Sequence, residues 1–171
     1  RSMHYVLGYD YSFKSNSRIK IETYYMHLFE VPVSESPSSF SSLNEGAVFS
    51  RFFPPTLMNK GSGQNYGLEF TFEKFFSKSY FFLFTSSLYE STYEGSDGIE
   101  RNTAFNGNYA ANLLGGKEFT AGKSKNTVFS TGIKISYAGG LRYTPVDTAA
   151  SNVAGEIVEV DSLRNTQQFP D

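Results

Sequence analysis

The run from Asn65 to Glu73 alternates between apolar and polar side chains, and this alternation restricts the fold more than any other feature. Tyr66, Leu68, Phe70 and Phe72 alternate with Gly67, Glu69, Thr71 and Glu73. Successive side chains of a β-strand point to opposite faces, so the run predicts a strand with one apolar and one polar face. A helix would instead bring apolar residues together every third or fourth position.

Similar runs recur along the chain and predict an all-β fold. The expected strands are residues 4–13, 18–31, 65–76, 80–93, 106–119 and 126–140. Their length exceeds the usual strand of soluble proteins, which has about 5–6 residues. We find no convincing helical pattern. The sequence therefore predicts an antiparallel up-and-down meander of about six long strands.

The connections between these strands alternate between short and long. Short turns are expected near Asn16, near Lys78 and at residues 121–125, and long loops at 32–62, 94–103 and 141–171. Outer-membrane β-barrels have short periplasmic turns and longer extracellular loops. The alternation of short and long connections therefore favours part of a large transmembrane β-barrel. In such a barrel the turns would be periplasmic and the three loops extracellular.

The aromatic content favours the same class of protein. The chain contains 17 Phe and 12 Tyr but no Trp, and its mean hydropathy is nevertheless negative. No run approaches the roughly 18 apolar residues of a membrane-spanning helix. A barrel strand needs only about ten residues with every second one apolar. The rings gather near both ends of the expected strands, as in the aromatic belts of membrane proteins.

Charge and reactive residues narrow the possible functions. The net charge is −2, which gives no reason to expect a nucleic-acid partner. There is no Cys, and the two His residues, His4 and His27, lie on different segments, so a metal site is not expected. Glu69 and Glu73 are about 13 Å apart on one strand face, too far for a glycosidase pair. We expect neither an enzyme nor a cofactor.

Two further patterns favour ordinary explanations over special sites. Gly61, Gly63 and Gly67 are followed by a strand pattern, whereas a phosphate-binding glycine loop leads into a helix. The acidic residues between 94 and 100 do not have the spacing of an EF-hand, which favours an exposed acidic loop. If the chain contacts a ligand, the polar candidates in the middle loop are Asp97, Arg101 and Asn102.

Several segments in order resemble the barrel strands of Bacteroidetes-type TonB-dependent outer-membrane receptors. The first is residues 59–74, NKGSGQNYGLEFTFEK, and later segments are SLYES at 87–91, GSDG at 95–98, RNT at 101–103, FNGNY at 105–109, GKEF at 116–119, YAGG at 137–140 and RYTP at 142–145. The likeness runs from about Tyr5 to Pro145. It is carried by the order and spacing of the segments, because no single one is diagnostic.

The resemblance implies a receptor in the outer membrane, in contact with its lipid, for active uptake of a scarce nutrient. Such receptors have barrels of about 22 strands around a plug. A TonB-type partner that spans the periplasm supplies the energy, and substrates include iron chelates, cobalamin and glycans. Six strands cannot enclose a lumen, so we expect this chain to be a fragment from the C-terminal part of such a barrel, with the plug lying elsewhere.

Two other interpretations remain open from the sequence. A soluble β-sandwich that binds a ligand or carbohydrate also has alternating strands, and its exposed rings stack on sugars. A passive, porin-like barrel would have the same wall without a plug.

Overall fold

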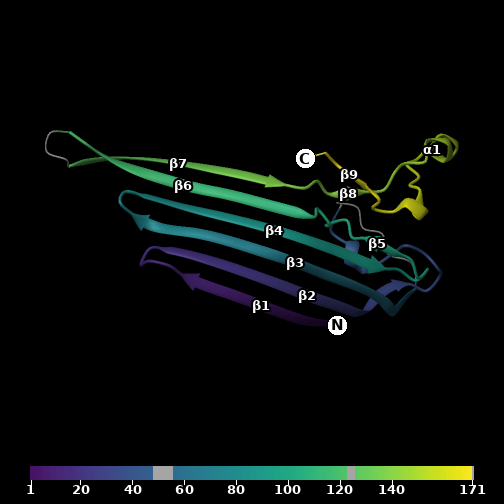
Figure 1. The fold of residues 1–171 in the computed structure, drawn as a ribbon. Coiled ribbons are helices and arrows are strands. Elements are labelled where there is room, and N and C mark those ends of the chain that lie inside the picture. The colour runs from purple at the N-terminus through teal and green to yellow at the C-terminus, as the bar shows by residue number, and fades with distance from the viewer. Residues whose placement is uncertain (48–55, 123–125, 171) are drawn as a thin grey trace.

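A computed structural model describes residues 1–47, 56–122 and 126–170. Most of the chain forms one long antiparallel sheet with strand order β1-β2-β3-β4-β6-β7 (Figure 1). The main strands are β1 (Ser2–Ser12), β2 (Ser17–Ser34), β3 (Leu57–Ser77), β4 (Tyr80–Glu94), β6 (Tyr109–Ala121) and β7 (Thr127–Ala138). Each main strand pairs with the next one along the chain. The predicted antiparallel meander of six long strands is confirmed.

The sheet is a single layer with two open edges. Every residue of β1 and of β7 is solvent-exposed, and these two strands form the edges. Within the described residues the sheet does not close into a barrel, and no second sheet covers either face (Figure 1). The long strands therefore have no hydrophobic core of their own.

The strands are staggered along their length. A line perpendicular to the strands runs through the register partners Ser12, Arg18, Glu73, Leu83, Leu114 and Lys134. This line crosses β7 at Lys134, which is seven residues from Thr127, the first residue of β7. Seven residues correspond to about 23 Å along a strand, and five strand spacings to about 24 Å across the sheet. Consider the line that joins Ser12 to Thr127, the two outermost strand ends at the short turns. The strands are tilted by about 44° from the perpendicular to this line.

This turn line, from Ser12 to Thr127, marks one end of the sheet (Figure 1). The β3–β4 turn falls within about 3 Å of it by the same spacings. In that turn Lys78 and Ser79 both have positive φ, 51° and 65°, which matches the two-residue hairpin turn that follows the natural strand twist. The short connections therefore share one end of the sheet, and the long ones extend from the other.

The loop end holds a compact cluster of irregular segments. The short strand β5 (Glu100–Asn102) pairs with β4, and β8 (Arg142–Tyr143) pairs with β9 (Gln167–Gln168). The cluster also contains the 3-10 helices η1 (Ser42–Asn44) and η2 (Asp161–Leu163) and the helix α1 (Thr148–Ala154). The buried apolar residues of the described chain are Val31, Val33, Tyr93 and Ala104, all at this end.

Several predicted boundaries were wrong. Strand β2 continues to Ser34 and strand β3 begins at Leu57, so the loop expected at 32–62 is shortened at both ends. The first residues of β3 lack alternation because Gly61 and Gly63 fit beneath Val33 and Leu43, where an added Cβ would clash. Strand β6 begins three residues later than expected, and β7 ends two residues earlier. Residues 48–55 of the first loop and 123–125 of the last turn lie outside the described residues.

The expectation of no helix was also wrong, because α1 lies in the segment from 141 to the chain end that we took as irregular. Its capping signals are present in the sequence. The Asp147 carboxylate accepts a hydrogen bond from the N–H of Ala150 at 2.9 Å, and Gly155 ends the helix with φ of 73°. At seven residues the helix is too short to give a visible period. Within the described residues, no helix has the length and apolar character needed to cross a membrane.

Candidate functional site

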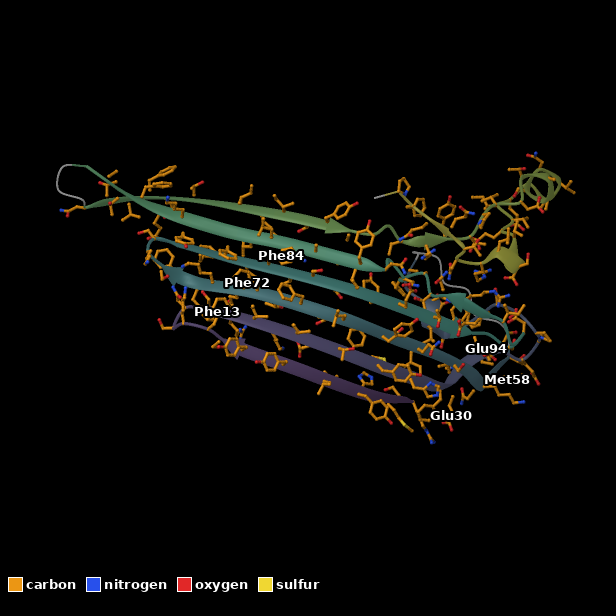
Figure 2. All side chains as sticks on the ribbon, viewed as in Figure 1. Phe13, Glu30, Met58, Phe72, Phe84 and Glu94 are labelled. Atoms are coloured by element: carbon orange, nitrogen blue, oxygen red, sulfur yellow. The ribbon has the colours of Figure 1, made fainter. Side chains whose placement is uncertain are left out.

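One face of the sheet is apolar along all six main strands, and we call it the apolar face. The register places in adjacent rows Tyr5, Leu7, Tyr9 and Tyr11 of β1, Ile19 and Ile21 of β2, Leu68, Phe70 and Phe72 of β3, Phe82, Phe84 and Leu88 of β4, Leu113 of β6, and Ile133 and Ile135 of β7. Neighbouring rings touch, as in the stacked pair Phe13 and Phe72 with centroids 5.9 Å apart (Figure 2). The apolar face thus extends across all six main strands, whereas the opposite face is mixed, because Leu83 and Leu114 are partners on it.

Aromatic side chains mark both ends of this face. Tyr11, Phe13, Tyr80, Phe119 and Phe129 lie within about 5 Å of the turn line. Tyr25, Tyr66, Tyr109 and Tyr137 lie roughly 20–25 Å from it by the same strand spacings. At each end two rings pair across β6 and β7, with centroids 5.5 Å apart for Tyr109–Tyr137 and 6.4 Å for Phe119–Phe129.

Between these two aromatic rows the apolar face of the described sheet carries no Asp, Glu, Lys or Arg. Lys74 and Lys117 lie near the turn line, and Glu90 lies at the loop end. The two lysines contact rings, Lys74 Nζ at 3.9 Å from the centroid of Tyr80 and Lys117 Nζ at 4.9 Å from that of Phe119. The charge-free region is the apolar band, about as tall as the roughly 25 Å band of outer-membrane barrels.

The opposite face, the polar face, carries charged side chains both near the turn line, as with Arg18, and at the level of the apolar band, as with Lys20, Glu22 and Glu69. Arg18 joins two strands, at 2.9 Å from Glu73 and 3.6 Å from Asp10. Lys20 contacts Glu22 at 2.6 Å, and Glu22 lies directly opposite Glu69 in the register. This face differs from a surface packed in a core, where charged side chains are rare.

Asp97 and Arg101, two of the predicted ligand-binding residues, form a buried ion pair with each other. Arg101 donates from both terminal nitrogens to the two carboxylate oxygens of Asp97, at 2.9 and 2.7 Å, and also to the carbonyl of Ile99. The Arg101 side chain is only 5% exposed. The hydrogen bonds from Arg101 lower the pKa of Asp97 below its ordinary value and raise the pKa of Arg101.

Asn102, the third candidate, belongs to a network of amide side chains. Its side-chain oxygen accepts a hydrogen bond at 2.8 Å from Asn106, which is fully buried and also donates to Glu90 at 2.7 Å. Asn108 donates to the other oxygen of Glu90 at 2.6 Å and accepts from Arg142 at 2.6 Å. The network joins β4, β5, the segment between β5 and β6, and β8.

A second set of bonds holds the C-terminal segment against the first loop. Asn165 donates to the carbonyl of Asn102 at 2.9 Å, and its backbone lies against Thr144. The buried Tyr93 hydroxyl donates to the carbonyl of Ser39 at 2.9 Å, and Ser39 donates to the carboxylate of Asp161. Burial raises the pKa of Tyr93. Burial also acts to raise the pKa of Asp161, but hydrogen bonds from Ser39 and Arg164 outweigh it and lower that pKa.

The structure therefore pairs Asp97 with Arg101 and places Asn102 in a separate hydrogen-bond network, while Nε of Arg101 is buried without a partner among the described residues. Sequence reasoning missed Asn44, Glu90, Asn106, Arg142 and Asn165. The close spacing of Asn102, Asn106 and Asn108 was the one signal that marked this region, because buried amides need several partners. We call the joined segments at this end the loop cluster. Its side chains hold together the described parts of the three loops.

The loop cluster is expected to loosen in acid. Because the pKa of Asp97 is lowered on folding, its contribution to stability is present above its ordinary pKa of 3.8 and is lost as the pH falls through the lower folded value. We expect hydrogen-exchange protection factors for residues 97–103 to stay constant from pH 8 to about 5 and to fall below about pH 4. In Asp97→Asn this acid step should shrink. Loss of protection between pH 7 and 5 would contradict the assignment.

The other candidate sites are accounted for by packing. Gly61, Gly63 and Gly67 lie inside β3 rather than in a phosphate-binding loop. His4 and His27 fall on opposite faces of the sheet, as their positions in β1 and β2 require. In the part of the chain that the structure describes, no group of three or more acidic or histidine side chains is arranged to hold a metal ion.

No family model, curated protein or solved structure matches the chain. The function must therefore be argued from the two faces of the sheet and from the loop cluster.

Proposed function

We propose that this chain is part of the wall of a transmembrane β-barrel in a bacterial outer membrane. The observation that carries the proposal is the apolar band, charge-free and bounded by aromatic rings, on a single-layer sheet. Apolar surface of this size is costly in water but is the required outer surface of a membrane barrel. In this assignment the apolar face contacts lipid, and the polar face lines the lumen.

The stagger of the strands supports the same proposal. Strands of membrane barrels are tilted by about 35–45° from the barrel axis. If the short turns lie in one plane parallel to the membrane, the register gives a tilt of about 44°. The tilt comes from backbone pairing alone, and the aromatic rows add the type of side chain found at each level.

A soluble β-sandwich fits the structure less well. Its apolar face would be covered by a second sheet about 10 Å away, with the two inner faces interdigitating. The described residues instead leave exposed large apolar side chains such as Leu7, Ile133 and Ile135, at 74%, 59% and 52% of their full area. A membrane removes this surface from water without a second sheet.

Among membrane barrels, we propose a receptor of the TonB-dependent type that takes up an iron chelate, cobalamin or a glycan. The likeness between about Tyr5 and Pro145 supports this class. The long loops also support it, because together they form an ordered cluster large enough to contact a ligand. The energising TonB-type partner and the plug would act through parts outside this chain. Asp97, Arg101 and Asn102 then position the loops, and no catalytic group is proposed.

The proposal is tested on the protein expressed at its full natural length. We expect it to fractionate with the outer membrane, to require detergent, and to migrate faster on a gel when unheated than when boiled. A monomer that remains in buffer without detergent would overturn the membrane assignment. In the same cells, nutrient uptake that stops when the proton-motive force is collapsed supports a receptor, whereas continued uptake indicates a passive barrel.

A further inference from the structure

An open groove of about 490 Å³ lies across β4, β6 and β7 near their turn ends. On the apolar face its floor is Gly115, which lies between its register partners Phe82 and Ile133. Lys117, Tyr80 and Thr131 line the end nearer the turn line, where Lys117 pairs with both of the other two residues. The groove thus has an apolar part and a cationic end.

The hollow exists because Gly115 lacks a side chain. A Cβ added there would meet only the carbonyl oxygen of Phe81 at 3.5 Å and the Cβ of Phe82 at 3.6 Å, which are ordinary contacts. The backbone of Gly115 also does not have a positive φ. Neither backbone conformation nor close packing therefore requires glycine at this position, in contrast to Gly116, whose added Cβ would meet the Phe81 ring at 2.6 Å.

Lys117 is a cation without an acidic partner among the described residues. Its neighbour Glu118 lies on the polar face, with register partner Ser130. Lys74, on the other side of Tyr80, directs its ammonium to the Oγ and carbonyl of Ser77 at 2.7 and 3.2 Å. The two lysines are the charged residues of the apolar face at the turn end, and both are positive.

The levels of these residues match the layers of a membrane leaflet. Tyr80 and Lys117 lie roughly 3–6 Å inside the turn line, and Gly115 and Ile133 roughly 11–14 Å. If the apolar face contacts lipid, the cationic end is at the headgroups and the groove is among the acyl chains. Basic groups at that level attract anionic headgroups.

We propose that this groove binds one anionic glycerophospholipid of the turn-side leaflet. Its phosphate contacts the Lys117 ammonium and the Thr131 hydroxyl, and an acyl chain lies over Gly115 between Phe82 and Ile133. The inference rests on the proposed function, because it needs the apolar face to be the lipid face. Charge complementarity selects a phospholipid over a second copy of the chain, since Lys117 of one copy would meet Lys117 or apolar surface of another.

The test uses the full-length protein in nanodiscs of phosphatidylglycerol and phosphatidylcholine, with the lipids that stay bound after detergent extraction counted by native mass spectrometry. We expect wild type to retain phosphatidylglycerol selectively. Lys117→Gln should reduce that retention roughly fivefold, the effect of one cation at a membrane surface. Gly115→Leu keeps the charge but fills the groove, and should also reduce retention.

Lys134→Gln is the matched control, because it removes a lysine from the polar face of the same sheet and should retain lipid like wild type. Heat-modifiable mobility is recorded for each variant. A folded Lys117→Gln protein that retains phosphatidylglycerol like wild type overturns the lipid site and leaves the wall assignment intact. If wild type instead retains a bound protein, and Gly115→Leu loses that protein, the lipid site is also overturned. A wild-type protein that never enters the nanodisc contradicts the proposed function itself.

Discussion

Leu113→Arg is expected to prevent stable membrane assembly, whereas Asn112→Arg is expected to leave it intact. Leu113 lies on the apolar face between Phe84 and Ile135, about 16 Å from the turn line and thus near the middle of the apolar band. An arginine facing lipid at the membrane midplane costs about 2–4 kcal/mol. Asn112 is the next residue of the same strand, on the polar face between Thr85 and Ser136. There an arginine remains in water.

The pair is compared by the fraction of protein that migrates as the compact, unheated form on a gel. Both variants add the same side chain to β6 at adjacent positions, so strand propensity and net charge are matched. Equal assembly of the two variants would show that the faces are not differently solvated. The reverse order, with Asn112→Arg the defective variant, would mean that the lipid and lumen faces are exchanged.

Arg101→Met is expected to destabilise the loop cluster by about 3 kcal/mol, toward the lower end of the range for breaking a buried ion pair. The substitution leaves the Asp97 carboxylate, whose side chain is 17% exposed, with the N–H of Ile99 but without its guanidinium partner. Opening of the cluster should appear as faster hydrogen exchange and faster protease cleavage within residues 94–108. The sheet should keep its protection, because its ladders do not depend on this pair.

The double variant Asp97→Asn with Arg101→Met should recover part of the loss, because the unpaired charge is removed as well. Glu100→Gln is the surface control; Glu100 is exposed and accepts a bond at 3.2 Å from Gln64, so its loss should have little effect. If Arg101→Met and Glu100→Gln had equal effects, the buried pair would not be what orders the cluster.

The sheet could be predicted from sequence because its signal repeats every two residues. Residues 65–73 alternate without a break, and each strand pairs with its neighbour in the chain, so local pattern and turn position determine most of the topology. The beginning of β3 escaped prediction because Gly61 and Gly63 are there to accommodate side chains of other segments. A requirement of this kind comes from packing between segments, and it produces no periodic pattern in the sequence.

The loop cluster was only partly predictable for a different reason. Its bonds join residues far apart in the chain, such as Asn102 with Asn165 and Ser39 with Asp161. The polar residues Asp97, Arg101 and Asn102 were recognised as a group, but a sequence does not show whether a polar group meets a ligand or another part of its own chain. Here the partners of Asp97 and Arg101 are each other, and the side-chain oxygen of Asn102 accepts from Asn106.

The two open edges of the sheet have consequences for how such a wall is assembled. Strands β1 and β7 present unpaired N–H and C=O groups along 11 and 12 residues, and hydrocarbon offers these groups no partner. Because each main strand pairs with the next main strand, the sheet can be extended one hairpin at a time, and at each stage it has two edge strands. If the segment leaves the ribosome or a chaperone before its edge strands pair with further strands, it exposes both unpaired edges and an apolar surface. This combination favours edge-to-edge aggregation into fibrils. If this segment is part of a barrel wall, as proposed, insertion and closure of the barrel have to be coupled in time.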